Sequence, residues 1–190
     1  MELVEKKLSS EEIFAGHILR VHRDTVLLPN GKTAFREVAD HPGGVAIVAL
    51  TEQQEVFLVE QYRYAFSRTM VEIPAGKRET GEAPFLTAQR ELLEEVGATA
   101  DTWYDLGTVI PSPGCYGETL YLYMAEGLHF SEQCLDEDEF LNVKKMPLAR
   151  LVELCLDGTV ADAKTVCGAL KAQAFLQAGK KPCPLTAEGV

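Results

Sequence analysis

The chain has 190 residues, which suits one folded domain with room for a small appendage and lets it bury about two thirds of the surface that the unfolded chain exposes. The formal net charge of −11 argues against nucleic acid or an anionic membrane as a docking surface, because both require clustered lysine and arginine. No apolar run reaches membrane-spanning length, and the N-terminal segment lacks the apolar core of a signal peptide.

The cysteines also bear on where the protein works. The chain has five, an odd number, and none has the C-x-x-C spacing of a metal or redox site, so neither a disulfide framework nor a zinc site is indicated. Reduced thiols and a missing signal peptide predict a cytosolic, and therefore cytoplasmic, location. The cysteines are Cys115, Cys134, Cys155, Cys167 and Cys183.

The first forty residues are predicted to form an antiparallel β meander. Residues 3–28 mix polar and apolar positions in the manner of strands. Residues 29–32 read Pro-Asn-Gly-Lys, a strong turn signal, and residues 33–38 supply the returning strand of a hairpin. Such a meander needs a covering partner, which is either the main domain or another chain.

A strand pair follows the break at residues 41–44. Residues 45–50 are apolar throughout, which predicts a strand that is buried on both faces. Residues 55–62 form its neighbour across a polar turn, and a short strand at residues 70–73 comes after them.

A helix is expected to begin at Pro84, because proline is well tolerated in a first helical turn, and to end at Gly97. Glu91 and Glu95 lie one turn apart on this helix, with Glu94 beside them, so three carboxylates share a side. The opposite, apolar face consists of Phe85, Ala88, Leu92 and Val96.

Three carboxylates on one side of a helix repel one another unless a cation offsets them. Arg90, four residues before Glu94, offsets part of this repulsion. A hard divalent ion would offset the rest, and Mg²⁺ suits carboxylates that are shared with substrate phosphates. The alternative is a solvated acidic helix face, since glutamate is a good helix former.

The rest of the chain adds strands, an acidic loop and two helices, so that a mixed sheet with helices on both sides is expected. The tail at residues 180–190 lacks periodicity and is expected to be loose. The predicted strands are residues 103–110, 119–125 and 140–144, the acidic loop is residues 136–139, and the helices are residues 147–155 and 161–178.

The stretch from Gly76 to Ala98 reads G-x5-E-x7-R-E-L-x-E-E-x-G and resembles the signature box of the Nudix hydrolases. Every fixed position is filled except the last, where Ala98 stands in place of a larger aliphatic residue. The resemblance implies an α/β fold, the Nudix α/β/α sandwich with a mixed central sheet, to which the N-terminal antiparallel β meander is an addition. The expected organisation is a meander at residues 1–40, a Nudix domain at residues 41–179 and the tail.

Segments around the box are similar to those of the ADP-ribose pyrophosphatase branch of this superfamily. Residues 57–64 resemble its V-x-Q-Y-R stretch, and residues 72–76 resemble its E-x-P-A-G lead into the box. Pro113, the acidic loop and the late helix start at residues 162–165 also correspond. The resemblance spans residues 14–178.

The resemblance implies how a metal site would be built. Glu91 and Glu95 would hold Mg²⁺, with Mn²⁺ as the alternative ion, while Glu94 assists and the backbone carbonyl of Ala75 adds a ligand. Arg90 would hold the glutamates in place. This also accounts for a phosphate-binding enzyme whose net charge is negative.

The resemblance further implies that the acidic loop carries the catalytic base. Glu139, directly before the apolar Phe140, is the favoured candidate, and Glu137 and Asp138 are its rivals. A carboxylate among neighbours of like sign can have a raised pKa and accept a proton from the attacking water.

Substrate binding is assigned to two regions by the same resemblance. Arg63 would pair with the diphosphate or the terminal ribose. The meander would be exchanged across a homodimer, so that Phe35, Arg36 and Glu37 reach the partner's adenosine, where an aromatic ring suits a purine face. The alternative for Phe35 is an ordinary core residue.

The resulting hypothesis is a Mg²⁺-dependent homodimeric enzyme that hydrolyses the pyrophosphate bond of ADP-ribose to AMP and ribose 5-phosphate. One alternative keeps the chemistry and changes the substrate to another nucleoside diphosphate sugar, such as a GDP-sugar or a UDP-sugar. Another is a non-catalytic nucleotide-sugar-binding regulator, against which the filled glutamate positions of the box weigh. The sequence leaves open the number of metals and which phosphorus the water attacks.

Overall fold

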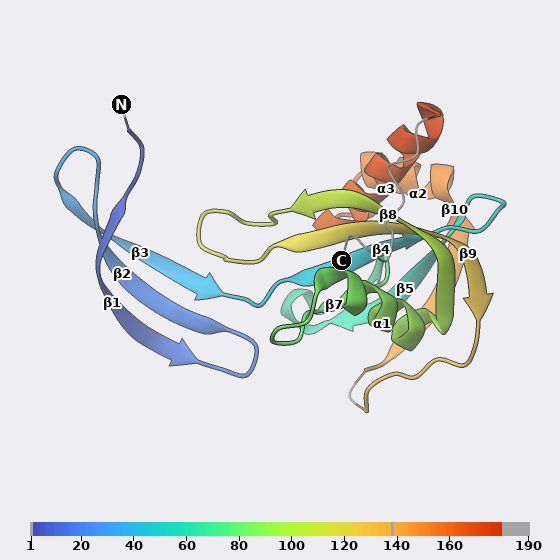
Figure 1. Cartoon of the computed structure of the whole chain (residues 1–190), viewed down its shortest axis with the longest axis horizontal. Coiled ribbons are helices and arrows are strands. Elements are labelled where there is room, and N and C mark those ends of the chain that lie inside the picture. The colour runs from blue at the N-terminus through green and yellow to red at the C-terminus, as the bar shows by residue number, and fades with distance from the viewer. Residues whose placement is uncertain (1, 138, 180–190) are drawn as a thin grey trace. The chain divides into compact units, whose positions relative to one another are not determined.

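The computed structural model describes residues 2–137 and 139–179, and it divides into two compact units (Figure 1). The first unit contains the residues up to Gly43 together with Ile110–Thr119. The second contains Gly44–Val109 and the residues from Leu120 onward. Among the described helices, none combines the length and the apolar character that crossing a membrane requires.

The first unit is a three-stranded antiparallel sheet in the order β1-β2-β3. The turn between β2 and β3 is closed by a hydrogen bond from the Gly31 amide to the Leu28 carbonyl, and Gly31 has a φ of 81°, as the Asn-Gly pair predicts. The predicted antiparallel meander is confirmed. Its strands are β1 Lys6–Ala15, β2 Arg20–Leu27 and β3 Thr33–Asp40.

This meander encloses almost no core. Every residue of β1 is exposed, and in β2 only Asp24 and Val26 are buried. Phe35 is 66% exposed, so the alternative that it is an ordinary core residue is not what this chain shows. A three-stranded sheet needs an apolar face packed against something for independent stability.

The second unit contains two sheets. The four-stranded sheet has the order β7-β4-β9-β8 and is mixed, because β4 runs parallel to β9 while the other pairs are antiparallel. The three-stranded sheet has the order β10-β5-β6 and is antiparallel. The strands are β4 Gly44–Ala49, β5 Glu55–Arg63, β6 Arg68–Glu72, β7 Ala75–Lys77, β8 Ala98–Val109, β9 Leu120–Phe130 and β10 Leu141–Pro147.

Strand β4 separates two hydrophobic cores, because side chains alternate across a strand. Val45 and Ile47 pack in the core beneath α1, whereas Ala46 and Val48 pack in the core that contains residues of α2 and α3. Helices therefore cover both faces, and the predicted α/β/α sandwich is confirmed. The helices are α1 Pro84–Val96, α2 Leu148–Leu156 and α3 Ala163–Gln177, with a short 3₁₀ turn, η1, at Tyr64–Phe66.

Helix α1 begins and ends where the sequence predicts. Pro84 occupies its first turn, and Gly97 follows its last residue with a φ of 69°, a left-handed conformation that donates its amide back to Leu93. Strand β8 starts at Ala98, five positions before the predicted strand, because its first residues are small or polar and give little hydrophobic signal. Strand β7 was not predicted, since three residues including a glycine carry no strand pattern.

Candidate active site

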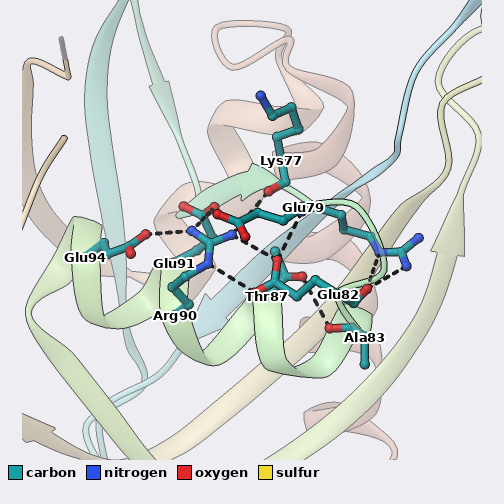
Figure 2. A network of polar contacts seen from close by, with 9 residues as sticks. Lys77, Glu79, Glu82, Ala83, Thr87, Arg90, Glu91 and Glu94 are labelled. Carbon is teal, nitrogen blue, oxygen red and sulfur yellow. Dashed lines mark hydrogen bonds and ion pairs between the residues drawn. The ribbon is translucent and has the colours of Figure 1, made fainter. Parts of the chain in front are cut away.

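Arg90 is the centre of a polar network on α1 (Figure 2). Its Nε donates to Glu82 Oε1 at 3.1 Å, its Nη1 lies 2.7 Å from Glu94 Oε2 and 2.9 Å from Glu91 Oε1, and its Nη2 donates to the Lys77 carbonyl at 3.2 Å. The hydrogen bond with Glu82 raises the pKa of Arg90, and Arg90 in turn lowers the pKa of Glu82 to about 2. One guanidinium thus fixes three carboxylates of the box.

Gly76 is required by the position of Glu91. A Cβ atom placed on Gly76 would lie 1.8 Å from the carboxyl carbon of Glu91, so any side chain there would displace that carboxylate. Strand β7 and helix α1 consequently meet with only the hydrogen of a glycine between backbone and carboxylate.

Glu95, one helical turn after Glu91 on α1, is held by the backbone of Ala75. The amide of Ala75 donates to Glu95 Oε2 at 2.8 Å, and the side chain of Glu95 is buried, with 3% of the residue exposed. Burial, followed by the charges of Glu91 and Glu139, raises the pKa of Glu95 to about 8. Burial raises the pKa of Glu91 to about 7, although Arg90 opposes this effect.

These two carboxylates suit a hard divalent cation. Both offer oxygen ligands, and burial, the largest cause of their raised pKa values, disfavours the charged carboxylates, which a bound cation would favour. In residues 2–137 and 139–179, no three His, Cys, Asp or Glu side chains already converge closely enough to hold a metal ion. The carboxylates are instead engaged by Arg90 and by the Ala75 amide, contacts that an ion would replace or share.

The last turn of α1 anchors the segment that leads to the acidic loop. The Ser131 amide donates to the Gly97 carbonyl at 2.6 Å, and the side-chain amide of Gln133 donates to the Glu95 carbonyl. A Cβ atom on Gly97 would lie 2.5 Å from the Ser131 carbonyl oxygen, so this approach also requires glycine. The acidic loop therefore starts from a fixed point beside the buried carboxylates.

Glu139 lies within electrostatic range of the carboxylate pair, since its charge raises the pKa of both Glu91 and Glu95. Its backbone amide donates to the Asp136 carbonyl at 3.0 Å. Glu137 is exposed, and Asp138 lies outside the described residues. The assignment of the base to Glu139 stays a prediction.

Arg63 is engaged by a buried carboxylate. Its Nε and Nη2 donate to the two oxygens of Glu72 at 2.8 and 2.7 Å, while Lys164 pairs with Glu72 Oε2 and with Asp162 at 3.0 Å. Burial alone would raise the pKa of Glu72, but Arg63 and Lys164 outweigh it and lower the pKa to about 2. Because 39% of the Arg63 side chain remains exposed, a contact with substrate stays a prediction and would have to share the guanidinium with Glu72.

Comparison with known proteins identifies the family. The model of the NUDIX domain matches residues 40–167, and that of the nucleoside diphosphate sugar hydrolase N-terminal domain matches residues 5–39. The chain belongs to the Nudix family. The family resemblance drawn from the box of residues 76–98 is thereby confirmed.

Individual proteins similar to this Nudix protein support the family assignment. The ADP-ribose pyrophosphatase of Bacillus subtilis (strain 168) is 42% identical over 165 residues, which cover 86% of this chain and 89% of the relative. The methanol dehydrogenase activator of Bacillus methanolicus is 42% identical over 164 residues, which cover 85% and 89%. A crystal structure of an ADP compounds hydrolase has a TM-score of 0.83 at 22% identity over 94% of this chain and 98% of that one, which shows the shared fold.

The structure brings together one part of the predicted Nudix site. Ala75, Arg90, Glu91, Glu94 and Glu95 are joined by the contacts described above, and Glu139 acts on the pair through its charge. Their chemical roles remain predictions.

The predicted adenosine-binding residues lie on β3 of the first unit. The guanidinium of Arg23 lies over the Phe35 ring at 5.3 Å, and Arg36 donates to the carboxylate of Glu5 at 2.9 Å through its Nε. Glu37 is exposed and stands opposite Arg23 in the sheet register. Their contact with a nucleotide stays a prediction.

Sequence analysis assigned no role to three charged residues that make these contacts, namely Glu82 beside Arg90 and the pair Glu72 and Lys164. Glu82 was visible as a fixed position of the box, and Glu72 as the acidic residue of Glu-Ile-Pro-Ala-Gly. Lys164 was visible only as part of the late helix start at residues 162–165, and a lysine in a helix is ordinarily solvated. Only the fold shows that it pairs with Glu72 across 92 residues of chain.

Proposed function

We propose that this Nudix protein hydrolyses the pyrophosphate bond of ADP-ribose to AMP and ribose 5-phosphate. A water oxygen forms a bond to one phosphorus, the bridging P–O bond breaks, and the water's two protons pass to the base and to the product phosphates. The observation that supports this most directly is the buried carboxylate pair, in which Glu91 packs against Gly76, Glu95 accepts from the Ala75 amide, and the charge of Glu139 acts on both. The 42% identity with an ADP-ribose pyrophosphatase supports the choice of substrate.

Nudix hydrolases generally use a divalent metal ion, and Mg²⁺ is the one proposed here, with Mn²⁺ as the alternative. Glu91 and Glu95 would hold it, assisted by Glu94 and the Ala75 carbonyl. When bound, the ion supplies positive charge that stabilises the developing charge on the phosphoryl oxygens.

The protein's own groups have separate tasks in this proposal. Arg90 keeps the glutamates of α1 in one geometry, because its donors are shared among Glu82, Glu91 and Glu94. Glu139 accepts the proton of the attacking water. Arg63 orients the diphosphate or terminal ribose from the side of Glu72.

We propose a cytoplasmic homodimer as the working form, and the exposed meander supports its dimeric state. Its apolar side chains include Ile13 and Phe14, which are more than half exposed in the single chain and would be covered by a second copy. In that arrangement Phe35, Arg36 and Glu37 would contact the adenosine bound by the partner.

The test of the function is a substrate panel with purified protein and Mg²⁺. ADP-ribose, a GDP-sugar and a UDP-sugar are compared by kcat/KM, with products separated by chromatography. ADP-ribose should be preferred and should yield AMP. A clear preference for guanine or uracil would move the assignment to another nucleoside diphosphate sugar, and no cleavage of any substrate would favour a binding protein.

Glu91→Gln tests the proposed role of Glu91 as a metal ligand. It removes one negative charge and retains the shape of the side chain, so turnover should fall by about 10²–10³-fold while the nucleotide still binds. Unchanged turnover would contradict the assignment of Glu91 as a metal ligand.

A further inference from the structure

The buried hydroxyl of Thr165 connects the first turn of α3 with Ile73, which lies just before the carboxylate site in the sequence. Thr165 has no exposed surface, and its Oγ1 accepts a hydrogen bond from the Ile73 amide at 2.9 Å. The same hydroxyl donates to Asp162 Oδ2 at 2.6 Å, and Asp162 also accepts from the Thr165 amide at 3.0 Å as the N-cap of the helix. Since the hydroxyl has one proton, its use towards Asp162 leaves the oxygen's lone pairs for Ile73.

Ile73 stands two residues before the amide that holds Glu95. The intervening Pro74 has a fixed φ and restricts the residue before it to extended conformations, so the backbone between Ile73 and Ala75 has little freedom to absorb a shift. The Pro74 carbonyl accepts from the Ile47 amide on β4 at 2.8 Å, which holds the turn from its other side. A displacement of Ile73 is therefore transmitted to the Ala75 donor, which lies 2.8 Å from Glu95 Oε2.

An ion pair also connects α3 with the same segment. Lys164, the neighbour of Thr165, pairs with Glu72, the neighbour of Ile73, and both residues are buried. Glu72 also accepts both donors of Arg63 on β5. The first turn of α3 thus holds two consecutive residues of the lead into the site, one by an ion pair and one by a neutral hydrogen bond.

We propose that Thr165 is a positioning residue for the carboxylate site. Its hydroxyl fixes Ile73 and through Pro74 sets the Ala75 amide against Glu95, so that the two buried carboxylates are presented together to a divalent cation. Thr165 touches neither substrate nor ion. The inference depends on the proposed function only for its catalytic readout, since metal binding can be measured without substrate.

The main variant is Thr165→Val, which keeps the shape of the side chain and removes the acceptor for Ile73. Thr165→Ser retains the hydroxyl and serves as the rescue. Ala169→Gly is the matched control, because it weakens the same helix at a fully buried position with no hydrogen bond to the site. Each protein is measured for Mn²⁺ binding by electron paramagnetic resonance without nucleotide, for thermal unfolding, and for kcat and KM with ADP-ribose.

Thr165→Val should weaken Mn²⁺ binding and lower kcat by roughly tenfold each, as is typical when a group that orients metal ligands is lost, while KM for ADP-ribose changes little. Thr165→Ser should return both values to within about twofold of the original protein. Ala169→Gly should lower Tm and leave Mn²⁺ binding and kcat unchanged. Equal Mn²⁺ binding and kcat in Thr165→Val and Ala169→Gly would overturn the proposal, because a purely structural threonine would affect only Tm.

Two further outcomes are informative. If the original protein binds Mn²⁺ and does not cleave ADP-ribose, the proposed function fails, and the Mn²⁺ affinities alone decide the role of Thr165. If Thr165→Val does not fold, Thr165→Ala replaces it, because the smaller side chain leaves room for a water beside the Ile73 amide. Weakened Mn²⁺ binding in Thr165→Ala supports the proposal, and an affinity equal to that of Ala169→Gly overturns it.

Discussion

The meander of the first unit and strand β4 of the second show how differently two β structures of one chain use their apolar residues. Every residue of β1 is exposed, including Leu8, Ile13 and Phe14, whereas every residue of β4 is buried between two layers of helices. The difference indicates that folding free energy comes mainly from the second unit. The apolar residues of the first unit are available for an interface.

A pair of identical substitutions tests this contrast most strongly. Ile47→Ala in β4 removes a side chain with no exposed surface and should lower the free energy of unfolding by about 2–5 kcal/mol. Ile13→Ala in β1, where 54% of the residue is exposed, should lower it by less than about 0.5 kcal/mol in a monomer. Urea unfolding gives both values, and light scattering shows whether Ile13→Ala weakens a dimer. Equal losses of stability would contradict the contrast.

Glycine substitutions extend the comparison to the site. Gly76→Ala places a methyl group against the Glu91 carboxylate and should lower kcat/KM by about 10²-fold, because the carboxylate must move. Gly114→Ala in the first unit meets no atom within 4 Å and is the control, with no expected loss. Steady-state kinetics with ADP-ribose measure both. A fully active Gly76→Ala protein would show that the position of Glu91 is unimportant.

The buried carboxylates of the second unit also predict that the stability of the protein depends on pH. The folded pKa values of Glu91 and Glu95, about 7 and about 8, exceed the ordinary value of 4.5, so the folded chain binds protons that the unfolded chain has released. This contribution to stability is complete below about pH 4.5 and is lost as the pH rises through about 7 and 8.

With a chelator present, Tm should therefore be lower by several degrees at about pH 8.5 than at about pH 6. Glu95→Gln should show a smaller difference, because one of the two titrating groups is gone. Added Mg²⁺ should raise Tm more at the higher pH, where both ligands are ionised. A Tm that falls equally in the original protein and in Glu95→Gln would assign the effect to other groups.

A small effect on stability is also expected for an exposed ion pair of the first unit. Arg36→Ala breaks the contact with Glu5 and should change the free energy of unfolding by less than about 1 kcal/mol. If Arg36 also contacts adenosine, KM for ADP-ribose should rise by several-fold with kcat unchanged. Arg20→Ala removes a comparable pair with Glu12, 3.0 Å apart, and is the control. Identical KM values in the two variants would exclude Arg36 from the nucleotide site.

Local patterns in the sequence predict the parts of the structure that neighbouring residues determine. The limits of α1 follow from Pro84 and Gly97, and its buried face follows from the spacing of Ala88, Leu92 and Val96. The contact of Arg90 with Glu94 follows from their separation by one helical turn. The branch within the family followed from short segments around the box, and the relatives confirm it.

The remaining features depend on contacts between distant segments. No periodicity indicates that Lys164 would form an ion pair with Glu72, or that the Thr165 hydroxyl would accept a hydrogen bond from the Ile73 amide. Arg63 was expected to contact the substrate, and no pattern indicated that its guanidinium would donate to Glu72, which stands opposite Val59 in the register of β5 and β6. The sequence likewise carries no signal for the raised pKa of Glu95, because that value arises from burial beneath the folded chain.

The attachment of Ser131 and Gln133 to the last turn of α1 has a consequence for how the acidic loop can vary. With its starting point fixed, the reach of Glu139 depends on the number of residues between that attachment and strand β10. A one-residue insertion or deletion in this interval would shift the reach by up to about 3.5 Å, more than the length of a hydrogen bond. Loop length, more than loop composition, should therefore be the property that evolution or design has to keep constant here.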